Sequence, residues 1–376
     1  MKKLNISGIV LFLLFCSAVH AKTGKEIATQ IAPLVNEATL FVAYADFSKI
    51  NVEQICGESV KQIEPLLNGV DLDEKSVKGI SREATKLVAK GQKRVQSYLD
   101  GLVQKSGVTD VFFVIQTEID ETGDETNESA LMFLAFPLEN RTKTQQDALS
   151  QVLSPGIEAE YLSEAIELHG FQIVAISVDN LESVSKERIE KALEPEPTQS
   201  LKFLEEAFSQ MENSSLQGAM LPGNGQFDKI LEAFNFFSAP SMYLGKDDET
   251  YREYVEIGKS YMKKISWLSY EFDFSTWTYR LTVNAKSEAD AKMLEKDFDR
   301  YILLSCELIK KNIAQEPDFA FFAPLAFEFV KGFYETQKPL RDGDQFITEW
   351  ESPMLFGNLL NLYVGIAHFT LPPLEE

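Results

Sequence analysis

Thr39-Leu40-Phe41-Val42-Ala43-Tyr44-Ala45 is an apolar run rich in β-forming residues, and Asp46 ends it. A short apolar run bounded by polar residues predicts a buried strand. Three further runs in the first half of the chain have the same character, at residues 110–117, 130–137 and 171–178. The first half therefore carries four predicted strands.

Helical patterns separate these strands. From residue 73 to residue 105, apolar side chains recur on one face of a long predicted helix, which Gly107 ends. Residues 142–153 predict another helix, and a further short one is expected near residues 158–168. The order strand, helix, strand, strand, helix, strand is that of the ferredoxin-like, split βαβ unit. This unit places helices over a four-stranded antiparallel sheet.

The second half repeats this plan loosely. We expect a short strand at residues 216–221, a hairpin at 265–285, a helix at 288–312 capped by Ser287, and a last strand at 345–351. Such self-similarity suggests an old duplication. Asp46 and Asp273 both open the tripeptide Asp-Phe-Ser after a strand-like run, although an Asp at a strand end also commonly caps a turn. The predicted fold class is α+β, with two tandem ferredoxin-like modules, each an antiparallel sheet covered by helices.

The segment Glu194-Pro-Glu-Pro197 is the best candidate for a linker, because two prolines with acidic neighbours interrupt a helical region. This places an N-terminal domain at residues 22–193, a linker at 194–199 and a C-terminal domain at 200–376.

The N-terminus has the three parts of a secretory signal peptide. Lys2 and Lys3 give a positive start, residues 9–15 are apolar, and Ala21 closes an A-x-A-like cleavage site. The apolar run is shorter than the roughly 20 residues of a spanning helix, which disfavours a retained anchor. A lipoprotein signal at Cys16 is disfavoured because Phe15 stands where a small residue is needed. We expect removal of residues 1–21 and a periplasmic or secreted bacterial protein that begins at Lys22.

Composition excludes several classes of function. The chain of 376 residues is 44 % hydrophobic, which is enough apolar material for packed cores. Its formal net charge is −22, whereas binding to nucleic acid or to anionic lipid headgroups requires clustered Lys and Arg. We therefore expect no nucleic acid partner. We also expect no transmembrane segment in the mature chain.

Two cysteines, Cys56 and Cys306, remain after Cys16 leaves with the signal peptide. An oxidising compartment permits a disulfide between them. The sequence does not tell how far apart their Cα atoms lie. A disulfide and two buried free thiols both stay open.

Catalytic and metal-binding patterns are absent from the sequence. The mature chain keeps only His169 and His368, which lie far apart, whereas a zinc site needs three or four ligands at workable spacing. No Gly-x-Ser-x-Gly motif occurs, and neither cysteine has a protease-type context. We therefore assign no catalytic residue, no cofactor and no metal ligand.

Acidic clusters raise calcium as an alternative, because oxygen ligands suit that ion. Their spacing does not follow the EF-hand pattern, so solvated hairpin tips are the favoured interpretation. Similarly, Pro222-Gly-Asn-Gly225 lacks the phosphate-loop motifs and is interpreted as a tight turn. The clusters are Glu118, Asp120, Glu121, Asp124, Glu125 and Glu128; Asp247, Asp248 and Glu249; and Asp342 and Asp344.

Aromatic residues gather in one stretch of the second half. They predict either a helix packed in the core, which is favoured, or an apolar groove for a ligand or a partner. The residues of this stretch are Phe319, Phe321, Phe322, Phe327, Phe329, Phe333 and Tyr334.

Short segments resemble a group of exported proteins of planctomycete-type bacteria. They are residues 40–55, with Asp46-Phe-Ser-Lys-Ile50 after a strand, Ala135-Phe-Pro-Leu-Glu139 after the third strand, and Ser287-Glu-Ala-Asp-Ala-Lys-Met-Leu294. The last is similar to segments of bacterial DUF3352-type proteins. This resemblance implies an uncharacterised exported protein and transfers no site residues.

These observations favour a non-enzymatic exported protein that binds a protein or an apolar ligand, or that serves an envelope role. Two alternatives stay open. One is an envelope hydrolase that uses a pair of carboxylates, whose separation the sequence does not give. The other is a structural module that dimerises through the edge strands of its sheets. The oligomeric state is not predicted.

Overall fold

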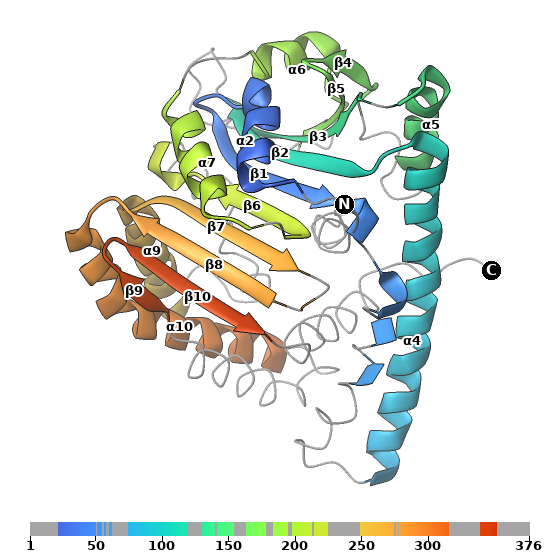
Figure 1. The fold of residues 1–376 in the computed structure, drawn as a ribbon. Helices are drawn as coiled ribbons and strands as arrows, with labels where there is room; N and C mark the ends of the chain where they lie inside the picture. Colours follow the sequence, from blue (N-terminus) through green and yellow to red (C-terminus); the bar gives the residue numbers. More distant parts are fainter. Residues whose placement is uncertain are drawn as a thin grey trace.

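The computed structural model describes residues 22–49, 51–54, 56–57, 60–61, 74–118, 129–139, 141–153, 163–177, 183–194, 198–212, 214–224, 249–273, 276, 278–315 and 339–351. These residues form helices and a single antiparallel sheet (Figure 1). The sheet has ten strands in the order β4-β5-β3-β2-β1-β6-β7-β8-β10-β9. The predicted mixture of helices with antiparallel strands is therefore confirmed.

The strands are β1 (Thr39–Asp46), β2 (Asp110–Glu118), β3 (Ser129–Pro137), β4 (Ile166–Leu168), β5 (Phe171–Ser177), β6 (Leu216–Met220), β7 (Ile265–Asp273), β8 (Thr278–Ala285), β9 (Leu340–Asp342) and β10 (Gln345–Glu351). The helices are α2 (Gly24–Ile31), α4 (Glu74–Asp100), α5 (Lys143–Leu153), α6 (Lys186–Ala192), α7 (Gln199–Ser209), α9 (Glu249–Lys264) and α10 (Glu288–Gln315). Short turns are η1 (Ala32–Leu34), η2 (Phe47–Lys49), the π-helical η3 (Gly101–Lys105) and η5 (Pro222–Asn224).

The two halves of the sheet follow the same path. In the first half the strand order is β1-β2-β3-β5-β4, and in the second it is β6-β7-β8-β10-β9. The helices match as well: α2 precedes β1 and α7 precedes β6, α4 and α9 precede the second strands, and α5 and α10 precede the terminal hairpins. The halves meet where β1 pairs with β6, for example at Val42 and Ala219. This repeated topology agrees with the duplication that the sequence suggests.

The two tandem ferredoxin-like modules are not confirmed. In a split βαβ unit the third strand lies between the first two, whereas here β1 pairs directly with β2, with Tyr44 opposite Phe112. Each half also shares its sheet with the other, because the second edge of β1 is occupied by β6. In addition, Ile166–Leu168 forms strand β4, where a helix was expected.

The main core lies on one face of the sheet, under α2 and α7. Ile27 and Ile31 of α2 and Leu204 and Phe208 of α7 are fully buried against the central strands. Burial of each such side chain contributes about 1.5–3 kcal/mol. The N-terminus of α2 also lies so close to α7 that a Cβ atom on Gly24 would stand 1.9 Å from the carbonyl oxygen of Phe208. Only a glycine fits this approach.

Helices α9 and α10 pack on the opposite face. Trp267 of β7 belongs to the core under α7, while its neighbour Leu268 packs with Ile265, Ala291 and Leu294. Because successive side chains of a strand point to opposite faces, the two helix layers lie on opposite sides of the sheet.

Side chains cap the first turns of α2 and α10, and the cap of α10 was predicted from the sequence. Ser287 Oγ accepts a hydrogen bond from the backbone N–H of Asp290 at 3.1 Å, so the predicted cap of α10 is confirmed. Thr23 and Glu26 form a reciprocal capping box at the start of α2. Gly107, with φ of 64°, ends the long helical stretch of α4 and η3.

Within the described residues, no helix combines the length and the apolar character needed to cross a membrane. Residues 1–21, the prolines of the expected linker and the aromatic stretch from Phe319 to Tyr334 lie outside the described residues.

Candidate functional site

Charged side chains gather at one end of the central strands, where β1 and β7 end and β2 and β8 begin. We call this group the sheet-edge cluster, and it comprises Lys22, Asp46, Lys49, Asp110, Glu271, Asp273 and Arg280. Since β6 runs antiparallel to both β1 and β7, the ends of β1 and β7 reach the same edge. The fold thus brings Asp46 and Asp273, the two Asp-Phe-Ser aspartates, to one edge.

Asp46 and Asp273 are not equivalent in the repeat, however. Asp46 ends the first strand of its half and Asp273 ends the second strand of the other half. The shared tripeptide therefore does not mark the duplication. What the two acids share is Lys49: burial lowers the pKa of Lys49, and the charges of Asp46 and Asp273 oppose that shift.

Lys22 is held by several contacts of its side chain. Its Nζ forms an ion pair with Asp110, whose side chain is only 11 % exposed, and donates a hydrogen bond to Gln30 at 2.7 Å. The same ammonium lies 5.6 Å from the ring centroid of Tyr44 and 5.9 Å from that of Phe112. Cation–π attraction adds to the ion pair at such distances.

The backbone of Lys22 is held too. Its carbonyl oxygen accepts a hydrogen bond of 3.4 Å from Nε2 of the buried Gln217. Asp110 and Asp46 are direct cross-strand partners, and both are buried. Lys22 therefore brings positive charge next to a pair of buried acids.

Glu271 is the second buried acid with defined partners. One carboxylate oxygen accepts hydrogen bonds from the backbone N–H of Glu212 at 2.9 Å and from Ser214 Oγ at 2.8 Å. The other lies 3.8 Å from Nη1 of Arg280. Burial raises the pKa of Glu271, and these hydrogen bonds and Arg280 oppose the shift. Desolvation is thus the dominant effect on this carboxyl group.

This shift predicts the pH dependence of a Glu271→Gln variant. A carboxyl group whose pKa is raised on folding favours the folded state while it is protonated, and this contribution is lost as the pH rises through the folded-state pKa. Glutamine keeps an acceptor for Ser214 without a charge to desolvate. We expect the variant to be at least as stable as the native protein at pH 8, and the difference to disappear near pH 4. Thermal unfolding at both pH values checks this; a variant that is less stable at pH 8 but not at pH 4 contradicts it.

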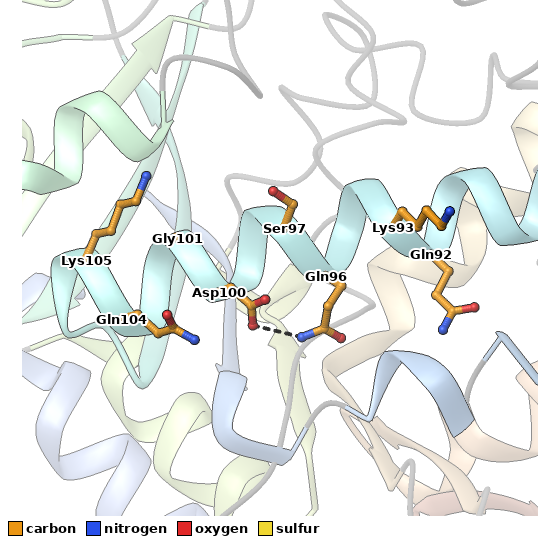
Figure 2. A pocket seen from close by; sticks show the side chains of 8 residues that line it. All are labelled: Gln92, Lys93, Gln96, Ser97, Asp100, Gly101, Gln104 and Lys105. Atoms are coloured by element: carbon orange, nitrogen blue, oxygen red, sulfur yellow. Dashed lines mark hydrogen bonds between the residues drawn. The ribbon is translucent and has the colours of Figure 1, made fainter.

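A separate hollow lies along α4 and η3. Its volume is about 480 Å³, and the described residues that line it are Gln92, Lys93, Gln96, Ser97, Asp100, Gly101, Gln104 and Lys105 (Figure 2). We call it the α4 hollow. Asp100 is the single acid among these lining residues, and it accepts a hydrogen bond from Gln96 at 2.9 Å. The described part of the lining therefore offers mainly amide, hydroxyl and ammonium groups, which suit a polar ligand.

The π-helical turn η3 forms one end of this hollow. It spans Gly101–Lys105 directly after α4. π-Turns are rare within helices and frequently occur at functional sites. The sequence does not predict this turn, because the apolar spacing continues through Leu102 as in an ordinary α-helix.

The cysteines do not form the disulfide that the sequence left open. Cys56 and Cys306 are both buried and are not joined to each other. Burial raises the pKa of the Cys56 thiol to about 11, which makes it a poor nucleophile at neutral pH.

Other candidate residues lie in turns or outside the described residues. His169, with φ of 51°, forms the exposed β4–β5 turn with Gly170, and Asp342-Gly343-Asp344 forms the equivalent exposed turn between β9 and β10. Pro222–Asn224 forms a short 3-10 turn, which confirms the expected turn for these three residues, while Gly225 lies outside the described residues. A Cβ on Gly223 would stand 2.6 Å from the carbonyl oxygen of Ser266. His368, residues 119–128, Asp247, Asp248 and the aromatic groove candidates lie outside the described residues.

Metal binding finds no site among the residues that the structure describes. No group of three or more His, Cys, Asp or Glu side chains there is arranged to hold an ion. Within the sheet-edge cluster, Asp110 is paired with Lys22 and Glu271 with Arg280.

Comparisons with protein families, with curated proteins and with solved structures found no match to this chain. The resemblance to exported planctomycete-type proteins therefore stays a prediction.

Proposed function

We propose that this chain is an exported bacterial protein that binds a ligand or a component of the cell envelope without catalysing a reaction. The observation that carries the binding role is the α4 hollow, whose described lining combines three glutamines, two lysines and a serine with one acid that is already hydrogen-bonded. Amide and ammonium groups recognise polar ligands by hydrogen bonding.

The contacts of Lys22 support export. The residue that follows the expected cleavage site is paired with Asp110, bonded to Gln30 and held by Gln217. The capping box of Thr23 and Glu26 comes directly after it. Removal of residues 1–21 would keep every one of these contacts.

A carboxylate-dependent hydrolase is the less favoured alternative. Asp46 and Asp110 are adjacent, and Glu271 has a raised pKa, as a general acid requires. Yet Asp110 is bound to Lys22 and Thr109, and Glu271 to Ser214 and the backbone of Glu212. Acids engaged in this way stabilise a fold and are poorly placed to exchange protons with a substrate.

Dimerisation through sheet edges is not favoured either. The terminal strands of the described sheet, β4 and β9, each have three residues. Short edge strands are one of the devices that prevent pairing with another sheet.

Fractionation of the producing cell tests the proposal. We expect the protein in the periplasmic or secreted fraction, and a Leu13→Arg variant, which interrupts the apolar run of the signal, in the cytosol. A matched Lys25→Gln variant beyond the cleavage site should be exported normally. Native protein that stays in the cytosol overturns the proposal of export.

A further inference from the structure

The segment that contains α4 and η3 is basic in an acidic protein. From Glu74 to Lys105 the chain has eight Lys and Arg but three Asp and Glu, a net charge of +5, whereas the whole chain carries −22. The overall charge thus conceals a local concentration of positive charge on a single long helix. In Figure 1, this helix runs along one side of the molecule.

The exposed basic side chains form a stripe. Lys78, Arg82, Lys86 and Lys93 are all exposed, and their spacing places them on one side of α4. Val88 and Leu99 are buried on the other side. With a rise of 1.5 Å per residue, the stripe is about 22 Å long. We call these four residues the basic stripe.

An ion pair within α4 involves one residue of the stripe, Lys78. Lys78 bonds to Glu74 at 2.6 Å, but the two side chains are 67 % and 84 % exposed. An exposed pair of this kind contributes little and exchanges readily with other ions. The stripe also leads toward the α4 hollow, where Lys93 belongs to both and Lys105 lies at the far end (Figure 2).

The shape of the stripe distinguishes between anionic partners. Charges act over about 8 Å at physiological ionic strength, so a thin polymer lying along α4 is influenced mainly by the stripe. A flat anionic membrane, in contrast, would also approach the acidic remainder of the molecule and be repelled. Among the α4 side chains that the structure describes, the apolar Val88 and Leu99 are buried and are not available for insertion between lipids.

We propose that the basic stripe of α4 binds a linear anionic polysaccharide, and that the α4 hollow receives one of its sugar units. The ammonium and guanidinium groups pair with the carboxylates or sulfates of the polymer. The amides of Gln96 and Gln104, together with Ser97, then have hydroxyl groups as partners. This inference rests on the proposed binding role of α4 and gives it a ligand class.

Binding of purified protein to dextran sulfate tests the inference, with uncharged dextran as the control polymer. We expect binding to dextran sulfate alone, with an affinity that falls about 100-fold between about 50 and 200 mM salt as counterions are released from some four to five contacts. The variant Lys78→Gln, Arg82→Gln, Lys86→Gln, Lys93→Gln should bind at least tenfold more weakly at low salt.

A matched variant separates the stripe from overall charge. Lys25→Gln, Lys186→Gln, Lys202→Gln, Lys292→Gln removes four exposed cations from α2, α6, α7 and α10, and should bind as the native protein does. Circular dichroism of both variants shows whether they are folded. Equal losses in the two variants, or no binding of the native protein at low salt, overturn the inference.

The last experiment measures binding of the protein to vesicles of phosphatidylglycerol and phosphatidylcholine. We expect no binding to them, and binding that exceeds binding to dextran sulfate overturns the choice of a polysaccharide. Because all arms use purified protein, they are independent of the fractionation that tests export. If the protein does not bind dextran sulfate, the proposal of export is unaffected. If fractionation finds the protein in the cytosol, the measured affinities for the polymers are unaffected.

Discussion

Gly24→Ala is expected to destabilise the protein by about 3 kcal/mol, because the added methyl group would overlap backbone atoms that cannot move alone. Its Cβ would lie 1.9 Å from the carbonyl oxygen of Phe208 and 2.8 Å from the carbonyl carbon. To accept it, α2 must separate from α7, and this opens the core formed by Ile27, Ile31 and Leu204. Chemical denaturation of the purified variant measures the loss.

Gly79→Ala is the matched control. Gly79 is exposed in α4, and a Cβ there would meet nothing within 4 Å. Since alanine is the better helix former, this variant should be more stable by about 0.5–1 kcal/mol. Equal effects of the two substitutions would contradict the close packing of α2 on α7.

Lys22→Met has the second largest expected effect, about 2–3 kcal/mol of destabilisation. Methionine keeps the apolar contact with Tyr44 and Phe112 but removes the ammonium, which leaves Asp110 buried without its cation. Loss of one partner of a buried pair costs far more than the pair itself contributes. Denaturation of the variant at neutral pH measures this cost.

A double-mutant cycle isolates the ion pair. In Asp110→Asn the buried charge is already absent, so adding Lys22→Met to it should cost less than Lys22→Met alone. Lys25→Met, on the exposed side of α2, should change stability by under about 0.5 kcal/mol. Additive effects at Lys22 and Asp110 would show that the pair does not hold the N-terminus.

The sequence predicts local structure well in this protein. Apolar runs such as residues 110–117 correspond to strands, and the stop at Gly107 and the cap at Ser287 are confirmed. These features depend on neighbours in the chain. The order of the strands in the sheet depends instead on distant parts of the chain. Nothing in the run from Thr39 to Ala45 reveals that β6, more than 170 residues away, pairs with the second edge of β1. A strand buried on both faces has the same apolar pattern whether it lies inside one large sheet or in one of two separate sheets.

In the candidate sites too, the sequence predicts single residues but not which residues the fold brings together. Asp46 and Asp273 were visible as strand-end acids, but their shared lysine, Lys49, depends on how the strands are arranged. In the sequence, Lys22 stood out only as the residue after a predicted cleavage site, although it makes several contacts that hold the fold together. The basic stripe was hidden by the overall charge of −22, and a count of charge by segment would have found it.

The intact mass of the native protein recovered from outside the cytoplasm shows where the mature chain begins. We expect a chain that begins at Lys22, the residue held by Asp110 and Gln217. A full-length chain that still carries Met1, or a terminus several residues beyond Lys22 in a stable protein, would contradict it.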